Sequence, residues 1–280
     1  MRRCITFLTD FGLEDHYVGT MKGVVLGINP DAVFVDICHA VGAQDIREGA
    51  VLLEAAAPYF PDGTVHVAVV DPGVGTARRA IAIEVGGQYL VGPDNGLLTL
   101  AVSALARRVG AVPAQRDGWL ALPPTARGVV LDRPSYWLPH VSATFHGRDV
   151  FAPVAAHLSR GVGLDALGTP VERIVALALP APSLTPQGVR GEVVHVDRFG
   201  NLITNLRPDD LPPAPLAVEI AGRRIDRLSR TFQDGAGLIA LVGSMDRLEI
   251  AVPNGNAAAA LGVGVGEPVV VRRGGSPPTS

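Results

Sequence analysis

Short apolar runs alternate with longer stretches of helical periodicity along the first half of the chain. Strands are predicted where the apolar runs are short, at residues 4–8, 33–37, 64–70, 80–85 and 89–91. Helices are predicted at residues 17–28, 45–59 and 150–158, and after Gly96 as far as Ala106. This alternation is typical of βαβ units, so we expect a mostly parallel sheet with helices on both faces.

The ends of two helices are marked by local signals. Residues 17–28 carry apolar side chains at helical spacing, and Pro30 lies just beyond them, where it can stop the helix. Asp45 can cap the helix that follows it, and Glu48 stands three residues later, which is the spacing of a capping box. The second helix is therefore expected to begin directly after Asp45.

The second half of the chain has a different pattern. Short β-prone runs separated by turn-forming residues lie at 191–196, 202–205, 216–220, 238–242, 248–252 and 268–272. This spacing predicts a small antiparallel sheet or barrel. The stretch before these runs is rich in proline, as linkers are. We expect an α/β domain at residues 1–174, a linker at 175–188 and a smaller, antiparallel β-barrel-like domain at 189–280.

Composition narrows the class of protein. Of 280 residues, 48% are hydrophobic and 18% are charged, which is enough apolar material for two modest cores. The net charge is −3 and the basic residues are scattered, so no nucleic-acid partner is expected. No apolar stretch is long enough to cross a bilayer, and no signal peptide is evident, so we expect a cytoplasmic protein without a membrane partner. Cys4 and Cys38 are expected to be reduced, buried thiols.

The segment HVAVVDPGVGTARR, residues 66–79, carries the strongest chemical signal. A buried strand runs into Asp71 and a glycine-rich loop, and Arg78 follows seven residues later. Ligands of open α/β sheets sit at the carboxyl ends of strands, and glycines allow a ligand to approach the backbone. A second polar cluster, residues 144–149, supplies His146. An Asp, an Arg and a His gathered around one reactive atom indicate an enzyme.

Each of these residues also has an ordinary structural explanation. Asp10 could be a helix N-cap or a turn residue, Asp71 a turn former, and Arg78 and Arg79 solvated charges. His146 could be a polar histidine with its hydrogen bonds satisfied. Two further segments, 94–96 and 197–201, resemble a helix cap and a hairpin turn. The Gly73-Val74-Gly75 sequence lacks the third glycine of a dinucleotide fingerprint, so a nicotinamide cofactor is not expected.

The order of the polar motifs resolves this ambiguity. The motifs along the chain are TDFG at 9–12, MKG at 21–23, DICH at 36–39, DPGVGT at 71–76, GPDNG at 92–96, TFHGRD at 144–149 and DRFGN at 197–201. In that combination the chain resembles the S-adenosyl-L-methionine (SAM) hydrolases, also called SAM hydroxide adenosyltransferases. The fluorinating and chlorinating enzymes that attack the same sulfonium are relatives of this family.

The resemblance implies a fold, an assembly and a reaction. It implies an amino-terminal α/β domain, a carboxy-terminal β-barrel-like domain, and a homotrimer whose active sites lie between one subunit's first domain and a neighbour's second. The implied reaction is hydrolysis of SAM to adenosine and L-methionine, by attack of an activated water or hydroxide on ribose C5′. The implied catalytic residues are Asp71, Arg78 and His146, and the base is either His146 or Asp71.

The resemblance also implies substrate contacts. Asp10 would hold the ribose diol, and the remaining substrate-binding positions are Phe145, Gly147, Asp197, Phe199, Asn201 and Ser244. Asp197 and Ser244 match positions that hold the methionine amino and carboxylate groups, whereas Phe199 and Asn201 match adenine contacts. The fluorinating relative has an arginine after the serine, and this chain has Met245. The sequence therefore leaves the anchor of the methionine carboxylate open.

The expected chemistry needs no metal and no cofactor. A sulfonium leaves as a neutral thioether, and the sequence shows no cluster at metal-ligand spacing. One alternative is a SAM-dependent halogenase, but Gly147 replaces the serine of those enzymes and the Asp71 carboxylate would repel a halide. The other alternative is a non-catalytic protein that binds an adenosyl ligand.

Overall fold

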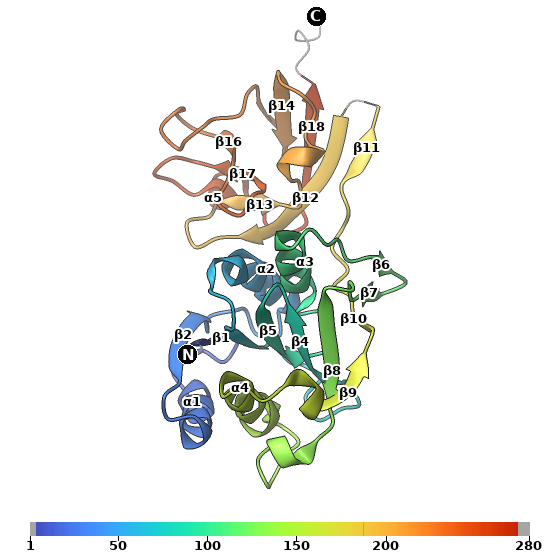
Figure 1. Cartoon of the computed structure of the whole chain (residues 1–280). Helices are drawn as coiled ribbons and strands as arrows, with labels where there is room; N and C mark the ends of the chain where they lie inside the picture. The colour runs from blue at the N-terminus through green and yellow to red at the C-terminus, as the bar shows by residue number, and fades with distance from the viewer. Residues whose placement is uncertain (1–3, 187, 274–280) are drawn as a thin grey trace, which may run out of the picture. The chain divides into compact units, whose positions relative to one another are not determined.

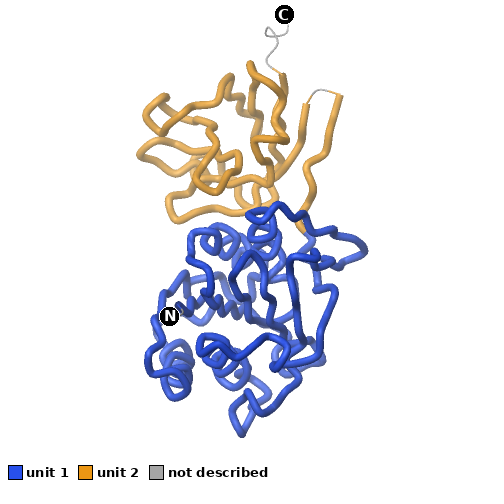
Figure 2. The backbone as a smooth tube through the Cα atoms, in the orientation of Figure 1, with its two compact units in different colours: residues 1–178 blue, residues 179–280 orange. Residues whose placement is uncertain are grey.

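A computed structural model describes residues 4–186 and 188–273 of the chain. The chain divides into two compact units, Met1–Ala178 and Leu179–Ser280, shown in blue and orange in Figure 2. The division falls inside residues 175–188, where a linker is expected. That stretch is not wholly irregular, because strand β11 (Ser183–Thr185) pairs antiparallel with the first residues of β12 (Gly188–Val196).

Unit 1 is built on a seven-stranded sheet in the order β2-β1-β3-β5-β4-β8-β9. Its strands are β1 (Cys4–Thr9), β2 (Val33–Cys38), β3 (Val65–Val69), β4 (Ala80–Val85), β5 (Gln88–Pro93), β8 (Ala126–Leu131) and β9 (Gly168–Val171). The half from β2 to β5 is parallel, whereas β4, β8 and β9 pair antiparallel with their neighbours. The predicted α/β class is confirmed, but the sheet is mixed rather than mostly parallel.

The change from parallel to antiparallel has a local cause. Gly86 and Gly87 join β4 to β5 with φ angles of +56° and +79°, and Val85 pairs directly with Gln88. Two positive φ angles in a two-residue loop make the type I′ turn of a tight hairpin, which only antiparallel strands can form. A glycine pair between two apolar runs was the available signal for this hairpin.

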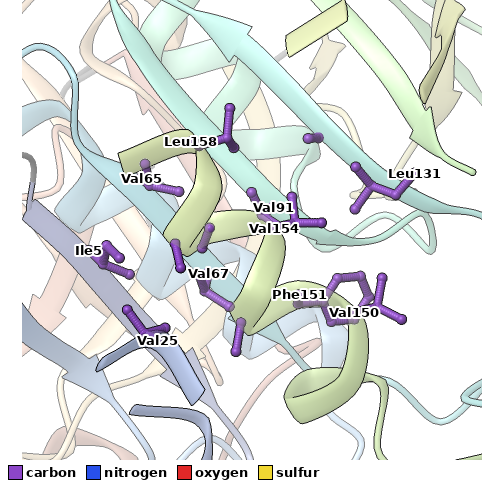
Figure 3. Packing of buried hydrophobic residues seen from close by; sticks show 14 of the residues in the cluster. Ile5, Val25, Val65, Val67, Val91, Leu131, Val150, Phe151, Val154 and Leu158 are labelled. Atoms are coloured by element: carbon purple, nitrogen blue, oxygen red, sulfur yellow. The ribbon is translucent and has the colours of Figure 1, made fainter. Parts of the chain in front are cut away.

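Two helix pairs cover the sheet of unit 1 (Figure 1). Helices α1 (Tyr17–Ile28) and α4 (Ala152–Ser159) pack against each other on one face, and α2 (Ile46–Ala56) and α3 (Thr99–Arg108) on the other. Phe151, Val154 and Leu158 pack with Val65 and Val67 of β3 (Figure 3). Each face of the sheet therefore has its own hydrophobic core, as predicted for a sheet covered on both sides.

The helix ends agree with the sequence signals in part. Helix α1 has the predicted bounds, and Asp45 caps α2 by accepting a 2.8 Å hydrogen bond from the Glu48 backbone N–H. The expected capping box is only half formed, because the Glu48 carboxylate accepts from the Gly42 N–H instead. Helix α2 ends at Ala56 rather than residue 59, since Pro58 lies in a 3₁₀ turn, Ala57–Tyr59.

Several elements of unit 1 lack a clear sequence signal. A small antiparallel sheet has the order β10-β7-β6, with β6 at Gln115–Arg116, β7 at Trp119–Ala121 and β10 at Arg173–Val175. The Trp119 ring lies under two guanidinium groups, those of Arg79 at 5.2 Å and Arg173 at 4.6 Å. These strands are too short for periodicity to reveal them.

Unit 2 is an eight-stranded, nearly closed antiparallel sheet that confirms the predicted barrel-like domain. Besides β11 and β12, its strands are β13 (Leu202–Thr204), β14 (Leu216–Ile220), β15 (Arg223–Ile225), β16 (Ile239–Val242), β17 (Leu248–Ala251) and β18 (Pro268–Arg273). Strand β12 pairs with β18 along its first half and with β13 along its second, which turns the sheet around one core. The sequence pattern missed β11, β15 and the short helix α5 (Ala257–Leu261).

The two cysteines are free thiols on adjacent strands β1 and β2. Both are half-buried, so the expectation of buried thiols is wrong. Their side chains stand at opposite ends of the strand pair, since Cys4 faces Val33 and Cys38 faces Leu8. Among the described residues, none of the helices has both the length and the apolar character that a membrane span requires.

Candidate active site

Arg78 joins the two polar loops of unit 1. Its Nε lies 3.0 Å from both carboxylate oxygens of Asp71, and its Nη2 donates a short hydrogen bond to Asp71 Oδ2. The same Nη2 lies 2.9 Å from His146 Nδ1. The Arg78 and Asp71 side chains are only 10% and 5% exposed. The three residues that the sequence singled out thus form one hydrogen-bonded group, so Arg78 is not a solvated charge. Asp71 does begin a turn, since its backbone oxygen accepts from Val74 N at 3.2 Å, but its side chain belongs to this group.

Gly75 explains why the two loops can meet. Its φ is +77°, and a Cβ atom built there would lie 2.2 Å from the carbonyl oxygen of Ala143. Only glycine fits this close approach of the second loop. We expected the loop glycines to admit a ligand, but at position 75 the neighbour is protein backbone.

A buried carboxylate, Asp149, organises the turn that follows His146. His146 directly precedes a π-helical turn, Gly147–Phe151, where the predicted helix was expected to begin only at residue 150. Asp149 in this turn is fully buried and accepts hydrogen bonds from Ser142 N at 2.8 Å and Arg148 Nε at 2.6 Å. Burial alone would raise the pKa of Asp149, but these hydrogen bonds outweigh it and hold the pKa below its ordinary value.

The protonation state of His146 follows from its neighbours. Burial lowers its pKa first, and the positive charge of Arg78 lowers it further, while the charges of Asp71 and Asp149 offset part of the shift. A guanidinium can only donate, so the Nδ1 atom that faces it must be the acceptor. His146 is therefore neutral and carries its proton on Nε2.

The Asp71–Arg78–His146 group borders a pocket of about 400 Å³ at the carboxyl ends of the parallel strands. The pocket is lined by Asp10, Phe11, Tyr17, Gln44, Val69, Asp71, Pro72, Val74, Thr144, Phe145, His146 and Gly147. Phe145 meets Phe11 and Tyr17 edge-on, with ring centroids 5.9 and 5.1 Å apart, so one wall is aromatic. A cavity with an aromatic wall and convergent polar groups is suited to a small organic ligand.

Asp10 lines this pocket and lies beside Gln44, the residue that precedes the N-cap of α2. Its carboxylate accepts a 2.8 Å hydrogen bond from the backbone N–H of Gln44, whose φ is +65°. The alternative that Asp10 is a helix N-cap is wrong, because the N-cap of α1 is His16 and that of α2 is Asp45. The unusual backbone at Gln44 brings a second loop to the pocket edge.

Arg79 and Asp94 form a separate ion pair. Arg79 Nε donates to Asp94 Oδ2 at 2.7 Å, and Asp94 Oδ1 accepts from the N–H of Val175 at 2.8 Å. Asp94 is buried and holds strand β10, so neither a helix cap nor a solvated Arg79 describes these residues. Neither residue lines the pocket, which separates this structural arginine from Arg78 beside it in the sequence.

Unit 2 has its own pocket, of about 920 Å³. Four of the residues expected to contact substrate line it: Asp197, Phe199, Asn201 and Ser244. Asp197 also organises the turn, since Oδ1 accepts from Phe199 N and Asn201 N, and Oδ2 from Asn201 Nδ2, each at 2.9 Å. The turn-forming explanation is thus correct for Asp197, and it leaves room for a contact with a ligand.

Sequence reasoning missed most residues of this pocket, and three of them carry charge or aromatic character. Arg230 and Phe232 come from the loop between β15 and β16, and Glu249 from β17. The loop has no periodicity, and Glu249 sits in an apolar strand where a charged residue suggests only an exposed face. Nothing in the spacing marks any of them.

The chain matches one protein family over most of its length. Residues 5–168 match the SAM hydroxide adenosyltransferase N-terminal domain, and residues 191–270 match the C-terminal domain of the same family. A protein of Thermus thermophilus named (R)-S-adenosyl-L-methionine hydrolase is 46% identical over 279 residues, covering 95% of this chain and 98% of that protein.

More distant similarity and a solved structure agree with this match. A protein of Actinoplanes sp. named fluorinase is 28% identical, over 77% of this chain and 75% of its own length. The crystal structure of an uncharacterized conserved protein from Thermotoga maritima superposes with a TM-score of 0.82 at 35% identity, covering 96% of this chain and all of that one.

Proposed function

The chain belongs to the SAM hydroxide adenosyltransferase family, and we propose that it hydrolyses S-adenosyl-L-methionine to adenosine and L-methionine. The observation that carries this proposal is the Asp71–Arg78–His146 group at the edge of a pocket of ligand size. The related Thermus protein is named for the (R) form of the compound, and we propose the same sulfonium configuration for this chain's substrate.

The substrate supplies the leaving group, so the enzyme's task is to place the nucleophile. Water oxygen attacks ribose C5′, the C5′–S bond breaks, and its electron pair stays on sulfur, which leaves as the neutral thioether of methionine. The attacking water loses one proton and becomes the 5′-hydroxyl of adenosine. Holding water in line at roughly 3–3.5 Å from the carbon removes most of the entropic cost of the step. No metal or cofactor is needed in this scheme.

The hydrogen bonds of His146 and Asp71 show which of these two candidate bases can accept a proton. The only lone pair of neutral His146 faces Arg78, so its Nε2–H can donate to the attacking water but cannot accept a proton. The Asp71 carboxylate keeps an unused lone pair beyond its contacts with Arg78. We therefore assign proton acceptance to Asp71, with His146 orienting the water and Arg78 fixing both side chains.

The substrate's other groups are assigned by position. Asp10 holds the ribose diol, while Phe145 and Gly147 pack against the sugar in the same pocket. In unit 2, Phe199 and Asn201 contact the adenine, and Asp197 and Ser244 the methionine group. We further propose a homotrimer in which unit 1 of one copy and unit 2 of a neighbouring copy share a substrate. The two free thiols fit a reducing compartment, and we place the reaction in the cytoplasm.

A halogenase is the second candidate, since fluorinases are relatives. The Asp71 carboxylate beside the nucleophile's place would repel a halide ion. Space at position 147 is also limited, because a Cβ atom there would lie 3.1 Å from the Met21 sulfur and 3.2 Å from the Phe145 ring. A serine at this position would have to displace both neighbours.

Product analysis tests the proposal. The protein is incubated with each sulfonium epimer separately, with and without added chloride or fluoride, and products are separated by chromatography. We expect adenosine and methionine in equal amounts over many turnovers from the (R) epimer, and almost none from Asp71→Asn. A 5′-halo-5′-deoxyadenosine would support the halogenase instead. Substrate that stays bound without turnover would support a binding protein.

A further inference from the structure

The pocket of unit 2 contains an arginine whose charge is unused. Arg230 lines the pocket and is exposed, and its guanidinium makes no hydrogen bond or ion pair within residues 4–186 and 188–273. An unpaired guanidinium in a concave site offers a planar set of donors suited to a carboxylate.

The loop that carries Arg230 is ordered. The Asp234 carboxylate accepts from the backbone N–H groups of Arg230 at 2.7 Å and Thr231 at 2.9 Å. Ser229 N donates to Ala240 O at 2.7 Å, which fastens the start of the loop to β16. The backbone at Arg230 is therefore held before any ligand arrives, which lowers the entropic cost of binding.

The opposite charge is also present and is also unused. Glu249 is 7% exposed and lines the pocket, and its carboxylate has no hydrogen-bond or ion-pair partner among the described residues. A Cβ built on Gly243 would lie 2.0 Å from Glu249 Oε2, so this carboxylate lies directly against the Gly243–Ser244 turn. Burial and the nearby charge of Asp197 both raise the pKa of Glu249, as expected where two carboxylates lack a cation.

Asp197 cannot satisfy a substrate ammonium group by itself. Its Oδ1 already accepts two hydrogen bonds and its Oδ2 one, which leaves a single lone pair. An ammonium group has three donors. Further acceptors are needed, and the unpaired Glu249 carboxylate lies in the same pocket.

We propose that this pocket binds the zwitterionic end of the substrate's methionine group, with Arg230 taking the α-carboxylate and Asp197 and Glu249 sharing the α-ammonium. The proposal rests on the proposed function, because it assigns the amino-acid end of that substrate. It answers the question raised by Met245: the carboxylate anchor comes from a different loop, whose residues 230–233 line the pocket.

Substrate analogues separate these contacts from general effects on the fold. The measurements are kcat and KM for SAM, for its decarboxylated analogue and for an analogue without the α-amino group. We expect Arg230→Ala to raise KM for SAM by about 10- to 100-fold with little change in kcat, because the contact is made equally in the ground and transition states. KM for the decarboxylated analogue should not change. Glu249→Gln should raise KM for SAM and leave KM for the deamino analogue unchanged.

Arg223→Ala is the matched control, because Arg223 is exposed on β15 of the same unit and does not line this pocket. It should leave every KM unchanged. Arg230→Gln, which keeps a polar side chain but removes the charge, guards against a folding defect in Arg230→Ala, and thermal melts should overlay for all variants. An equal rise of KM for SAM and the decarboxylated analogue, or no rise for either, would overturn the assignment of Arg230. A wild-type protein that fails to hydrolyse SAM would instead overturn the proposed function.

Discussion

The planar guanidinium of Arg78 donates hydrogen bonds to two acceptors of different charge, the Asp71 carboxylate and the neutral His146 ring. Its Nε and Nη2 hold Asp71, while Nη2 also meets His146 Nδ1. A lysine would keep the positive charge but could not span both partners in one plane. The shape of the Arg78 side chain therefore matters as much as its charge.

We expect Arg78→Lys to lower kcat by about 100-fold, since small misplacements of a catalytic group have effects of that order. KM should change little, because Arg78 does not line the pocket. Arg79→Lys is the control: it alters the ion pair with Asp94, so it should lower the melting temperature and leave kcat intact. Steady-state kinetics and thermal melts on both variants measure these effects. Equal losses of kcat would contradict the assignment of a catalytic role to Arg78 and a structural role to Arg79.

The pH profile should report the neutral state of His146. Its pKa lies below the ordinary value of 6.5, so the histidine accepts from Arg78 at neutral pH. Protonation on acidification would place a second cation beside the guanidinium and break that hydrogen bond. We expect kcat/KM to be level above the pKa of His146 and to fall as pH drops through it. The residual activity of His146→Asn should lack this fall. If its kcat/KM fell at acidic pH with the same midpoint as in the wild type, the assignment to His146 would be wrong.

At the scale of elements, the active site depends on one close approach between two loops. Gly75 passes the carbonyl of Ala143 at a distance that no Cβ atom allows, and this contact sets Arg78 beside His146. The first loop follows β3 and the second leads into the π-helical turn. π-Helical turns are frequent at functional sites, where they redirect a side chain.

Gly75→Ala should therefore reduce kcat by about 100-fold while costing about 1–3 kcal/mol of stability. Gly110→Ala is a close match, because Gly110 has a φ of +74° and nothing within 4 Å of a built Cβ. It should cost about 1 kcal/mol through backbone strain and leave kcat unchanged. Denaturant unfolding and kinetics on both variants provide the comparison. Similar kcat values would show that the loop contact is dispensable.

Local signals predicted elements well where one signal was enough. The spacing of the apolar residues and Pro30 predicted the bounds of α1. The alternation of strands with helices predicted the parallel half of the sheet. The pattern failed where the chain reverses direction, since the Gly86-Gly87 hairpin makes β4 antiparallel. It also failed at residues 147–151, because no periodicity distinguishes a π-helical turn from the start of an α-helix.

At the scale of the whole molecule, the core includes a buried histidine that does no chemistry. Gln88 Nε2 donates to Phe60 O, so its oxygen must accept from His66 Nε2, and the His66 Nδ1 atom accepts from the Thr6 hydroxyl. Burial lowers the pKa of His66 to about 4, from 6.5. The unfolded state therefore takes up this proton near pH 6.5, whereas the native state takes it up only near pH 4.

The contribution of His66 to the free energy of unfolding should thus be fully present above pH 6.5 and be lost as the pH falls towards 4. From the two pKa values, His66 should remove about 2 kcal/mol of unfolding free energy between about pH 7.5 and pH 5. His66→Gln should be less stable at neutral pH but lose about 2 kcal/mol less on this acidification. Urea unfolding at both pH values measures the difference. The same pH dependence in both proteins would contradict the role of His66.

The assembly can be tested by mixing two inactive proteins. Asp71→Asn disables the pocket of unit 1, and Asp197→Ala that of unit 2. If copies share substrates as we propose, mixed oligomers re-form sites with both units intact, and about a quarter of wild-type activity should return after subunit exchange. Activity that never exceeds the sum of the two variants would contradict a shared site.

The residues of the candidate site that belong to the sequence motifs could be predicted from the sequence. Asp71, Arg78 and His146 could be grouped because a buried strand and two polar clusters placed them at one edge of the sheet. Arg230 and Glu249 could not, since their common pocket arises only when a long loop folds beside β17. Sequence order carries no information about that contact.

Hydrolysis in oxygen-18 water, followed by mass spectrometry of both products, tests whether the site formed by Asp71, Arg78 and His146 directs a water molecule to ribose C5′. We expect a single heavy oxygen in the 5′-hydroxyl of adenosine and none in methionine. Label in a homoserine product, together with unlabelled 5′-methylthioadenosine, would place the attack on the amino-acid side of the sulfur and contradict the account.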